Sequence, residues 1–315
     1  MIACLFDGRQ VRIDRDYPEP QTPPGEVRIA LRLAGVCRTD LEIARGYMGF
    51  RGVLGHEFVG TALEGARKGR RVVGGINCVC GRCDMCRRGL PTHCRRRTTL
   101  GIDGRDGAFA ERLVLPEANL VPVPDGVPDR AAVFAEPLAA AIQITRQVDL
   151  APEQHIVILG DGRLGQLVAR VFRARGLSPM VVGKSPAKMA LVRRLGLQAI
   201  GSDDIHPDKT ADVVVEATGT ADGLATALGL VRPRGVIVLK STVADTAGLN
   251  LAPLVVDEVT VVGSRCGPMD ATVAMLAEAD LDLEPLITAE YPLTEADTAV
   301  RAAEEPEAIK VLVRP

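Results

Sequence analysis

The chain has 315 residues, of which 47% are hydrophobic and 25% charged, and its formal net charge is -2. This length exceeds what one hydrophobic core usually supports, so we expect two domains. The near-neutral charge gives no electrostatic reason to expect nucleic acid or an anionic membrane as a partner. No stretch approaches the length of a bilayer span, and the first residues are acidic where a signal peptide would be apolar, so we expect a cytoplasmic protein.

Residues 1 to about 125 have the pattern of β-strands. Short apolar runs at residues 27–33 and 111–115 alternate with clusters of proline and glycine at residues 17–25 and 122–128. This part of the chain is therefore predicted to be mostly β-structure.

Three residues in this half could form a catalytic metal site: Cys37, His56 and Glu136. Each alone is more often an ordinary residue, namely a buried thiol, a satisfied core histidine and a glutamate at a helix start. Together they offer a thiolate, an imidazole and a carboxylate. Three protein ligands and an open position are the composition of a catalytic zinc site. Their wide separation in the chain means that residue types alone do not prove this site.

A compact cysteine cluster lies between these residues. The spacing Cys-x-x-Cys-x-x-Cys, followed by a fourth cysteine eight residues later, can wrap one tetrahedral zinc ion without an open position, which is a structural site. Free or disulfide-bonded thiols are the alternative, and Cys78 or His93 could substitute as ligands, although they break the even spacing. The predicted ligands are Cys80, Cys83, Cys86 and Cys94.

From Ala131 the pattern changes to an alanine-rich helix that is predicted to extend to Val148, followed by alternating strands and helices up to about residue 265. Short apolar runs bounded by Gly, Pro or charge are typical of buried parallel strands. The alternation predicts an α/β domain with a doubly wound parallel sheet. The expected strands are residues 156–159, 180–182, 213–216, 236–239 and 259–262.

The first strand of this domain leads into Gly160-Asp161-Gly162-Arg163-Leu164-Gly165 and then a predicted helix. In this context Gly-x-Gly-x-x-Gly is the dinucleotide-binding turn. Its glycines permit the tight turn, the approach of a pyrophosphate and close helix packing, while the helix N-terminus donates amides to the phosphates. The alternative is an ordinary turn in a parallel sheet.

The cofactor is predicted to be NADP rather than NAD. A fold that prefers NAD usually offers an Asp or Glu to the ribose about twenty residues after the turn, yet residues 177–200 contain no acidic residue. Gly183 leaves room for a 2′-phosphate, which Lys184, Ser185 and Lys188 could bind. Alternatively, NAD is used without the acidic partner. Thr218, after the strand at 213–216, is a further candidate cofactor residue.

The motifs around Cys37 and His56-Glu57, the four-cysteine loop, Glu136-Pro137 and the glycine turn together resemble the zinc-dependent alcohol dehydrogenases of the medium-chain dehydrogenase/reductase superfamily, in the polyol, sugar and threonine branch. The resemblance spans nearly the whole chain. It implies a mostly β GroES-like catalytic domain (residues 1–136), a Rossmann domain (137–265) and a C-terminal segment that returns to the catalytic domain (266–315).

The resemblance also implies roles for single residues. Cys37 and His56 would hold the catalytic zinc with Glu136 as the third ligand, and Glu57 would lie next to the metal and coordinate it transiently. Asp40 would orient His56, and Thr39 would take the proton of the alcohol. Many relatives carry a relay histidine three residues after this threonine, whereas this chain has Glu42, which leaves the proton exit route open.

The implied activity is reversible hydride transfer between an alcohol, of the polyol, sugar or amino-alcohol type, and NAD(P), with two zinc ions per chain. We also expect a homodimer or homotetramer. Two alternatives are a reductase of an activated double bond or quinone, whose members commonly lack these zinc ligands, and a non-catalytic NADP-binding zinc protein. Lys240, after the strand at 236–239, is expected to face solvent.

Overall fold

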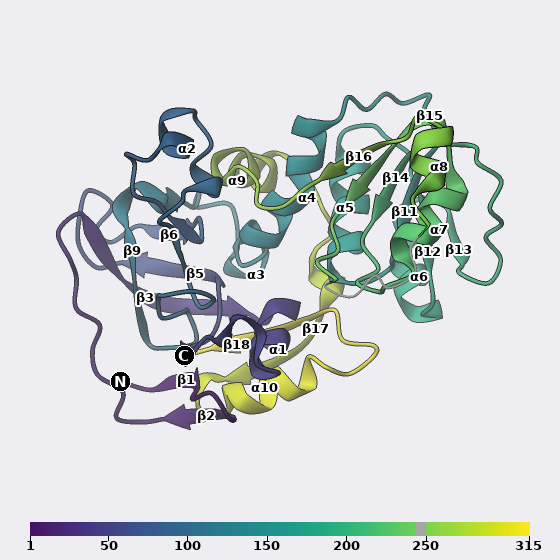
Figure 1. Ribbon diagram of the computed structural model, residues 1–315. Helices are drawn as coiled ribbons and strands as arrows, with labels where there is room; N and C mark the ends of the chain where they lie inside the picture. The colour runs from purple at the N-terminus through teal and green to yellow at the C-terminus, as the bar shows by residue number, and fades with distance from the viewer. Residues whose placement is uncertain (244–249) are drawn as a thin grey trace. The chain divides into compact units, whose positions relative to one another are not determined.

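The computed structural model describes residues 1–243 and 250–315. The chain forms two compact units. The first contains Met1–Glu136, Met269–Glu278 and Leu283–Pro315, and the second contains Pro137–Pro268 and Ala279–Asp282 (Figure 1). The described residues include no helix with both the length and the apolar character needed to cross a bilayer.

The first unit is built on β-sheets. The main sheet has the strand order β10-β6-β5-β3-β18-β17, with β9 also paired to β3, and smaller sheets have the orders β2-β1-β4 and β7-β8. The strands are β1 (Ala3–Phe6), β2 (Val11–Asp14), β3 (Glu26–Gly35), β4 (Gly52–Val53), β5 (Glu57–Ala62), β6 (Arg71–Gly74), β7 (Asn77–Cys78), β8 (Thr98–Thr99), β9 (Arg112–Pro116), β10 (Leu120–Pro122), β17 (Ile287–Pro292) and β18 (Lys310–Arg314).

Short helices connect these strands. They are α1 (Arg38–Ala44), α2 (Asp84–Arg87), α3 (Asp129–Ala132), α9 (Met269–Glu278) and α10 (Ala296–Ala302), with 3₁₀ turns η1 (Tyr47–Gly49), η2 (Pro91–His93), η3 (Glu117–Asn119), η4 (Glu284–Leu286) and η5 (Leu293–Glu295).

The C-terminal strand completes the main sheet of the first unit. β18 pairs antiparallel with β3, opposite Ala34 and Gly35, and parallel with β17, so the last residues of the chain lie beside a strand near its beginning (Figure 1). Inward-facing residues of β3 alternate with more exposed ones over most of its length, which is the period-two pattern of a sheet with one buried face. This pairing brings Lys310 close to Gly35 and Glu57.

The second unit is a parallel sheet with the order β13-β12-β11-β14-β15-β16, flanked by helices. In Figure 1, α5 packs beside β11, α6 beside β12 and β13, and α7 beside β14 and β15. The elements are α4 (Ala135–Gln147), β11 (Ile156–Leu159), α5 (Arg163–Ala174), β12 (Met180–Gly183), α6 (Pro186–Arg194), β13 (Ala199–Gly201), β14 (Ala211–Glu216), α7 (Gly223–Leu230), β15 (Val231–Leu239), α8 (Ala252–Val256) and β16 (Thr260–Gly263).

This strand order confirms the predicted doubly wound parallel sheet, and the first unit is mostly β-structure, as predicted. The chain reverses direction across the sheet between β11 and β14, and open α/β sheets bind ligands at the carboxyl ends of the strands at such a point. The buried strand β11, with the sequence Ile-Val-Ile-Leu, leads directly to the glycine turn there. The fold therefore places the turn where a dinucleotide would bind.

Candidate functional site

The sulfur atoms of Cys80, Cys83, Cys86 and Cys94 lie within 4.8 Å of one another. The Sγ–Sγ distances are 3.5 Å for Cys83–Cys86, 3.8 Å for Cys83–Cys94 and 3.5 Å for Cys94–Cys80. A tetrahedral zinc with Zn–S bonds of about 2.3 Å needs sulfur atoms about 3.8 Å apart. Disulfide sulfurs are only about 2 Å apart. The four thiols therefore fit a closed zinc site, and neither Cys78 nor His93 belongs to the group found among the described residues.

The loop around these thiols is ordered by polar contacts of its own. Cys94 Sγ accepts the backbone N–H groups of Cys80 and Arg96, both at 3.4 Å. Arg95 makes a bidentate ion pair with Asp84 at 2.7 and 2.8 Å. The backbone N–H of Arg82 lowers the pKa of Cys80 to about 6, with help from the N–H of Cys83. These amides favour the thiolate, which is the form that binds metal.

A second group contains Cys37, His56 and Glu57, whose potential ligand atoms also lie within 4.8 Å of one another. Cys37 is the N-cap residue of α1, and Glu57 begins β5 directly after His56. Only 2% of His56 and 1% of Glu57 is exposed. A partly buried thiol, a buried imidazole and a buried carboxylate thus meet between a helix start and a strand start, and this donor set suits zinc.

Asp40 organises this second group. Its Oδ2 accepts the N–H of Cys37 at 2.8 Å, its Oδ1 accepts the N–H of Gly55 at 3.1 Å, and its Oδ1 lies 3.3 Å from Nδ1 of His56. That last contact is not aligned as a hydrogen bond, so the buried Nδ1 has no hydrogen-bond partner. Burial lowers the pKa of His56, but the charges of Asp40 and Cys37 outweigh it and raise the pKa well above its ordinary value. The surroundings of the imidazole therefore favour a positive charge, which a metal cation also supplies.

The carboxylate of Glu57 is paired with Lys310 from β18, and both side chains are almost fully buried. The backbone of Gly35 leaves the space for this pair, because a Cβ there would lie 2.5 Å from Oε2 of Glu57 and 3.3 Å from Cδ of Lys310. The Lys310 ammonium also lies 5.3 Å from the centre of the Phe134 ring. Lys310 was not predicted from the sequence, although a lysine inside the apolar run from Ile309 to Val313 was the signal that could have revealed it.

The remaining predicted catalytic residues lie on α1 and α4. Thr39 Oγ1 is 3.9 Å from the sulfur of Cys37. Glu136, the second residue of α4, is not a member of the Cys37 group found among the described residues. Glu42 is engaged by Arg38 at 2.7 Å and Arg45 at 3.1 Å on the outer face of α1.

The glycine turn has the geometry that its sequence predicts. Gly160 has a φ of +112°, and a Cβ there would lie 2.6 Å from the carbonyl oxygen of Ala217. A Cβ on Gly165 would lie 1.9 Å from the carbonyl oxygen of Gly160, so only glycine lets α5 approach the turn. A Cβ on Gly162 would meet nothing within 4 Å. The open space at Gly162, before the α5 residues Arg163 and Leu164, is suited to a phosphate-bearing ligand.

The other predicted cofactor residues follow β12 and β14. Ser185 caps α6 by accepting the N–H of Lys188 at 3.2 Å, and Lys184 and Gly183 precede it at the strand end. Thr218 donates its N–H and its hydroxyl to Oε1 of Glu216, at 2.8 and 2.5 Å. Both segments leave the carboxyl ends of their strands, as a dinucleotide site in this fold requires.

The prediction that Lys240 faces solvent is wrong. Its side chain is buried, and its ammonium donates to the carbonyl oxygens of Ala140 and Arg265, at 2.9 and 3.1 Å, and to Oγ of Ser264 at 3.2 Å. Because these acceptors come from two separate segments, the lysine links the end of β15 to α4 and to the segment after β16. Its burial costs less than that of an isolated charge, because the ammonium has acceptors.

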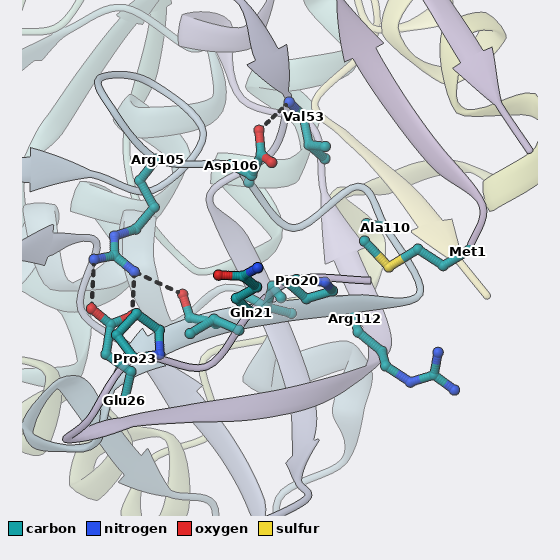
Figure 2. Close-up of a pocket in the computed structure, with 13 residues that line it drawn as sticks. Met1, Pro20, Gln21, Pro23, Glu26, Val53, Arg105, Asp106, Ala110 and Arg112 are labelled. Atoms are coloured by element: carbon teal, nitrogen blue, oxygen red, sulfur yellow. Dashed lines mark hydrogen bonds and ion pairs between the residues drawn. The ribbon is translucent and has the colours of Figure 1, made fainter. Parts of the chain in front are cut away.

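A cavity of about 230 Å³ in the first unit contains none of the predicted site residues (Figure 2). Its charged groups already have partners: Arg105 pairs with Glu26, and Asp106 accepts the N–H of Val53 at 2.9 Å and the hydroxyl of Tyr17 at 2.7 Å. Figure 2 shows the Arg105 guanidinium directed at Glu26 and the Asp106 carboxylate at Val53. This cavity is therefore not the candidate site.

The chain is similar in sequence and fold to known dehydrogenases. Residues 23–125 match the family model of the alcohol dehydrogenase GroES-like domain, and residues 131–314 match that of the glucose dehydrogenase C-terminus. The chain is 31% identical to an L-threonine 3-dehydrogenase of Streptomyces avermitilis, covering 95% of this chain and 94% of that protein. It is 28% identical to a sorbitol dehydrogenase of Halalkalibacterium halodurans, covering 96% and 95%.

The fold is shared with solved structures of the same kind. An alcohol dehydrogenase from E. coli CFT073, complexed with the cofactor NADH, has a TM-score of 0.90 and 25% identity, covering 100% of this chain and 99% of that one.

Proposed function

The chain belongs to the zinc-dependent alcohol dehydrogenase family of the medium-chain dehydrogenase/reductase superfamily, and we propose that it oxidises a polyol, sugar or amino alcohol at a zinc site built on Cys37 and His56. It is an NAD(P)-dependent oxidoreductase of this family. The observation that carries the proposal is the proximity of the partly buried Cys37 thiol to the buried His56 and Glu57 side chains in the GroES-like unit.

We assign the catalytic zinc to Cys37, His56 and one carboxylate. A zinc ion held there would act as a Lewis acid and lower the pKa of the substrate hydroxyl. The third ligand is Glu136 in the sequence-based prediction, and Glu57 is the carboxylate that the structure has within the group. Zinc content decides between them. Loss of about one zinc ion per chain in Glu136→Gln, but not in Glu57→Gln, supports Glu136, and the reverse result supports Glu57.

The surrounding side chains orient the ligands and move the proton. Asp40 fixes the N–H of Cys37 and faces the imidazole of His56, which sets the direction of both ligands. Thr39 is proposed to accept the proton of the substrate hydroxyl, because its own hydroxyl can accept and donate. Lys310 holds the carboxylate of Glu57 and balances its charge. We do not propose that Glu42 accepts the proton from Thr39, since its carboxylate is paired with Arg38 and Arg45.

A second zinc ion is proposed for Cys80, Cys83, Cys86 and Cys94. The sulfur distances of 3.5 to 3.8 Å support a closed tetrahedral site. Such an ion orders a loop that has little apolar surface to bury and takes no part in the reaction. Together the two groups support about two zinc ions per chain.

The nucleotide is proposed to bind along Gly160–Gly165, with its pyrophosphate at Gly162 and the N-terminus of α5, and with Thr218 beside β14 as a further contact. The open space at Gly162 supports this placement. The prediction of NADP is supported by the residues that follow β12, because a glycine, a hydroxyl and two cations suit a 2′-phosphate. These residues are Gly183, Lys184, Ser185 and Lys188. The carboxylate of Asp161, which contacts the same strand end, acts against that preference.

The substrate class follows from the relatives. Their names specify sorbitol, L-threonine and 2-dehydro-3-deoxy-L-galactonate as substrates of dehydrogenases. These molecules share a hydroxyl group flanked by further polar groups. We therefore propose a small polyhydroxylated or amino alcohol for this chain, and the corresponding carbonyl compound in the reverse direction.

A substrate screen tests the proposed function. Purified protein is mixed with a panel of polyols, sugars, amino alcohols and simple alcohols, and with the matching carbonyl compounds, in the presence of each nicotinamide nucleotide. Nicotinamide absorbance reports turnover. Polyols or amino alcohols that react faster than simple alcohols support the proposal. Turnover only with quinones or activated double bonds would support the alternative reductase instead.

We further propose a homodimer or homotetramer joined through the edge of the parallel sheet. Among the described strands, β16 is the last in the sheet, and it pairs with β15. Its Val261 is 38% exposed, and Val255 and Val256 of the neighbouring α8 are 79% and 78% exposed. An unprotected strand edge with apolar neighbours is a surface that pairs with another strand.

A cytoplasmic location stays a prediction from the sequence.

A further inference from the structure

The second residue of the glycine turn, Asp161, contacts the end of the neighbouring strand. Its Oδ2 accepts the backbone N–H groups of Lys184 at 3.0 Å and Ser185 at 2.8 Å. These amides directly follow β12, which is the strand end that holds the ribose-binding acid in many NAD-binding folds. The chain therefore does have a carboxylate at this position, although no acidic residue occurs in the sequence from Leu177 to Ile200.

The absence of a side chain at Gly183 makes this contact possible. A Cβ at Gly183 would lie 2.5 Å from both Cβ and Oδ2 of Asp161. The space beside Gly183, which suggested room for a 2′-phosphate, is thus occupied by the Asp161 side chain from the glycine turn. Any larger residue at position 183 would push the Asp161 side chain away from the two amides.

Further hydrogen bonds fix the turn in this place. Gly160 donates its N–H to the carbonyl oxygen of Val182 at 2.8 Å. The buried side chain of Gln166 donates to the carbonyl oxygens of Asp161 at 3.3 Å and Lys188 at 2.8 Å. Because the turn, β12 and α6 are tied together, the carboxylate has a defined position and is not a freely rotating surface group.

We propose that Asp161 determines the cofactor selectivity and makes the protein favour NAD over NADP; this inference rests on the proposed dinucleotide site. A 2′-phosphate would need the N–H groups of Lys184 and Ser185, which the carboxylate already occupies, and would bring a like charge close to it. An unmodified ribose instead offers hydroxyl groups that a carboxylate accepts. Both bonds of Asp161 go to Oδ2, so Oδ1 is the oxygen that accepts from the ribose.

Lys184 and Lys188 act in the opposite direction. Their charges attract a 2′-phosphate, and in the wild-type protein the Asp161 carboxylate counters that attraction. Removal of the negative charge at position 161 should therefore expose a cationic strand end that favours NADP. The sequence-based prediction of NADP rested on these two lysines. It did not include Asp161, whose carboxylate lies beside the same strand end although the residue belongs to the glycine turn.

Calorimetric titration with NAD and NADP tests this inference directly. The proteins are the wild type, Asp161→Asn, which keeps the shape of the side chain, and Asp161→Ser, which offers a hydroxyl to a phosphate. Asp204→Asn is the matched control. Asp204 is an exposed acid that follows the adjacent strand β13, and its substitution removes the same charge. Titration with the adenosine fragment, with and without its 2′-phosphate, isolates the contribution of that group.

We expect the wild type to bind NAD more tightly than NADP. The NADP:NAD affinity ratio should rise by about tenfold or more in both Asp161 variants and stay near wild type in Asp204→Asn. A wild type that prefers NADP, or a ratio that neither Asp161 variant changes, overturns the inference and leaves the proposed dehydrogenase function intact. Binding of neither nucleotide to the folded wild type overturns both.

Discussion

The ion pair between Glu57 and Lys310 shows how a single buried contact supports the metal group. Removal of one partner leaves an uncompensated charge in a site where neither residue is more than 2% exposed. We expect Lys310→Met to lower the free energy of unfolding by about 3–5 kcal/mol. The double variant Glu57→Gln, Lys310→Met should recover much of this loss, because it removes both charges. Chemical denaturation of the zinc-loaded proteins measures both values.

The matched control is Arg314→Met in the same strand. Arg314 pairs with Glu290 at 3.4 Å, but its side chain is 56% exposed, so the loss should stay below about 1 kcal/mol. Equal destabilisation by Lys310→Met and Arg314→Met would show that the strand, not the buried pair, accounts for the effect.

Sequence separation explains which site residues could be predicted. The four cysteines of the zinc loop lie within fifteen residues, so their spacing alone indicates that the sulfur atoms meet. Glu57 and Lys310 are 253 residues apart, and only the pairing of β18 with β3 brings them together. Asp161 was assigned to the turn correctly, but the direction of its side chain depends on the distance between two strands, which no local pattern specifies.

At the scale of elements, the glycine turn separates residues that are needed for folding from residues that are needed for the ligand. A Cβ on Gly165 would lie 1.9 Å from the Gly160 carbonyl oxygen, whereas a Cβ on Gly162 meets nothing within 4 Å. We expect Gly165→Ala to lower the melting temperature and weaken nucleotide binding together. Gly162→Ala should weaken nucleotide binding at a stability within about 0.5 kcal/mol of wild type.

Thermal unfolding without nucleotide, followed by calorimetric titration of each variant, separates the two effects. Each alanine variant serves as the control for the other, because the chemical change is the same. A loss of stability in Gly162→Ala as large as that in Gly165→Ala would contradict the open space assigned to the pyrophosphate.

The elements of the parallel sheet were largely predicted, and one helix was not. All five predicted strands are present with shifts of up to five residues at their ends, because each is a short apolar run bounded by glycine, proline or charge. The helix predicted from Ala131 to Val148 instead forms α3 and α4, with a break at Val133 and Phe134. Pro137 explains the break, since it has no N–H to donate to the carbonyl of Val133 and its ring crowds that carbonyl.

At the scale of the whole molecule, the chain leaves the first unit at residue 136 and returns to it for its last strands. The metal group therefore depends on both ends of the sequence, because β18 supplies Lys310 to the site that Cys37 and His56 begin. A truncated N-terminal half would lack the partner of Glu57. The sequence motifs predicted the order of the domains along the chain. They did not predict that β18 pairs with β3, because that pairing forms only in the folded unit.

The exposed edge of the parallel sheet leads to a prediction about assembly. We expect Val261→Lys to convert the protein to a monomer, because a charge on β16 opposes strand pairing and burial of the adjacent valines. Light scattering after size-exclusion chromatography gives the molar mass. Leu90→Lys is the control, since Leu90 is 45% exposed but lies in the first unit near the zinc loop. An unchanged oligomer in Val261→Lys would contradict assembly through this edge.

The assignment of the catalytic zinc to Cys37 and His56 is tested by zinc content and alcohol turnover, measured together in Cys37→Ser. We expect about two zinc ions per chain in the wild type and about one in the variant, with turnover abolished and the melting temperature nearly unchanged. Cys86→Ser is the matched comparison, since the same substitution in the four-cysteine loop should mainly lower the melting temperature. A Cys37→Ser variant that keeps both zinc ions or its turnover would contradict the assignment of the catalytic zinc to Cys37.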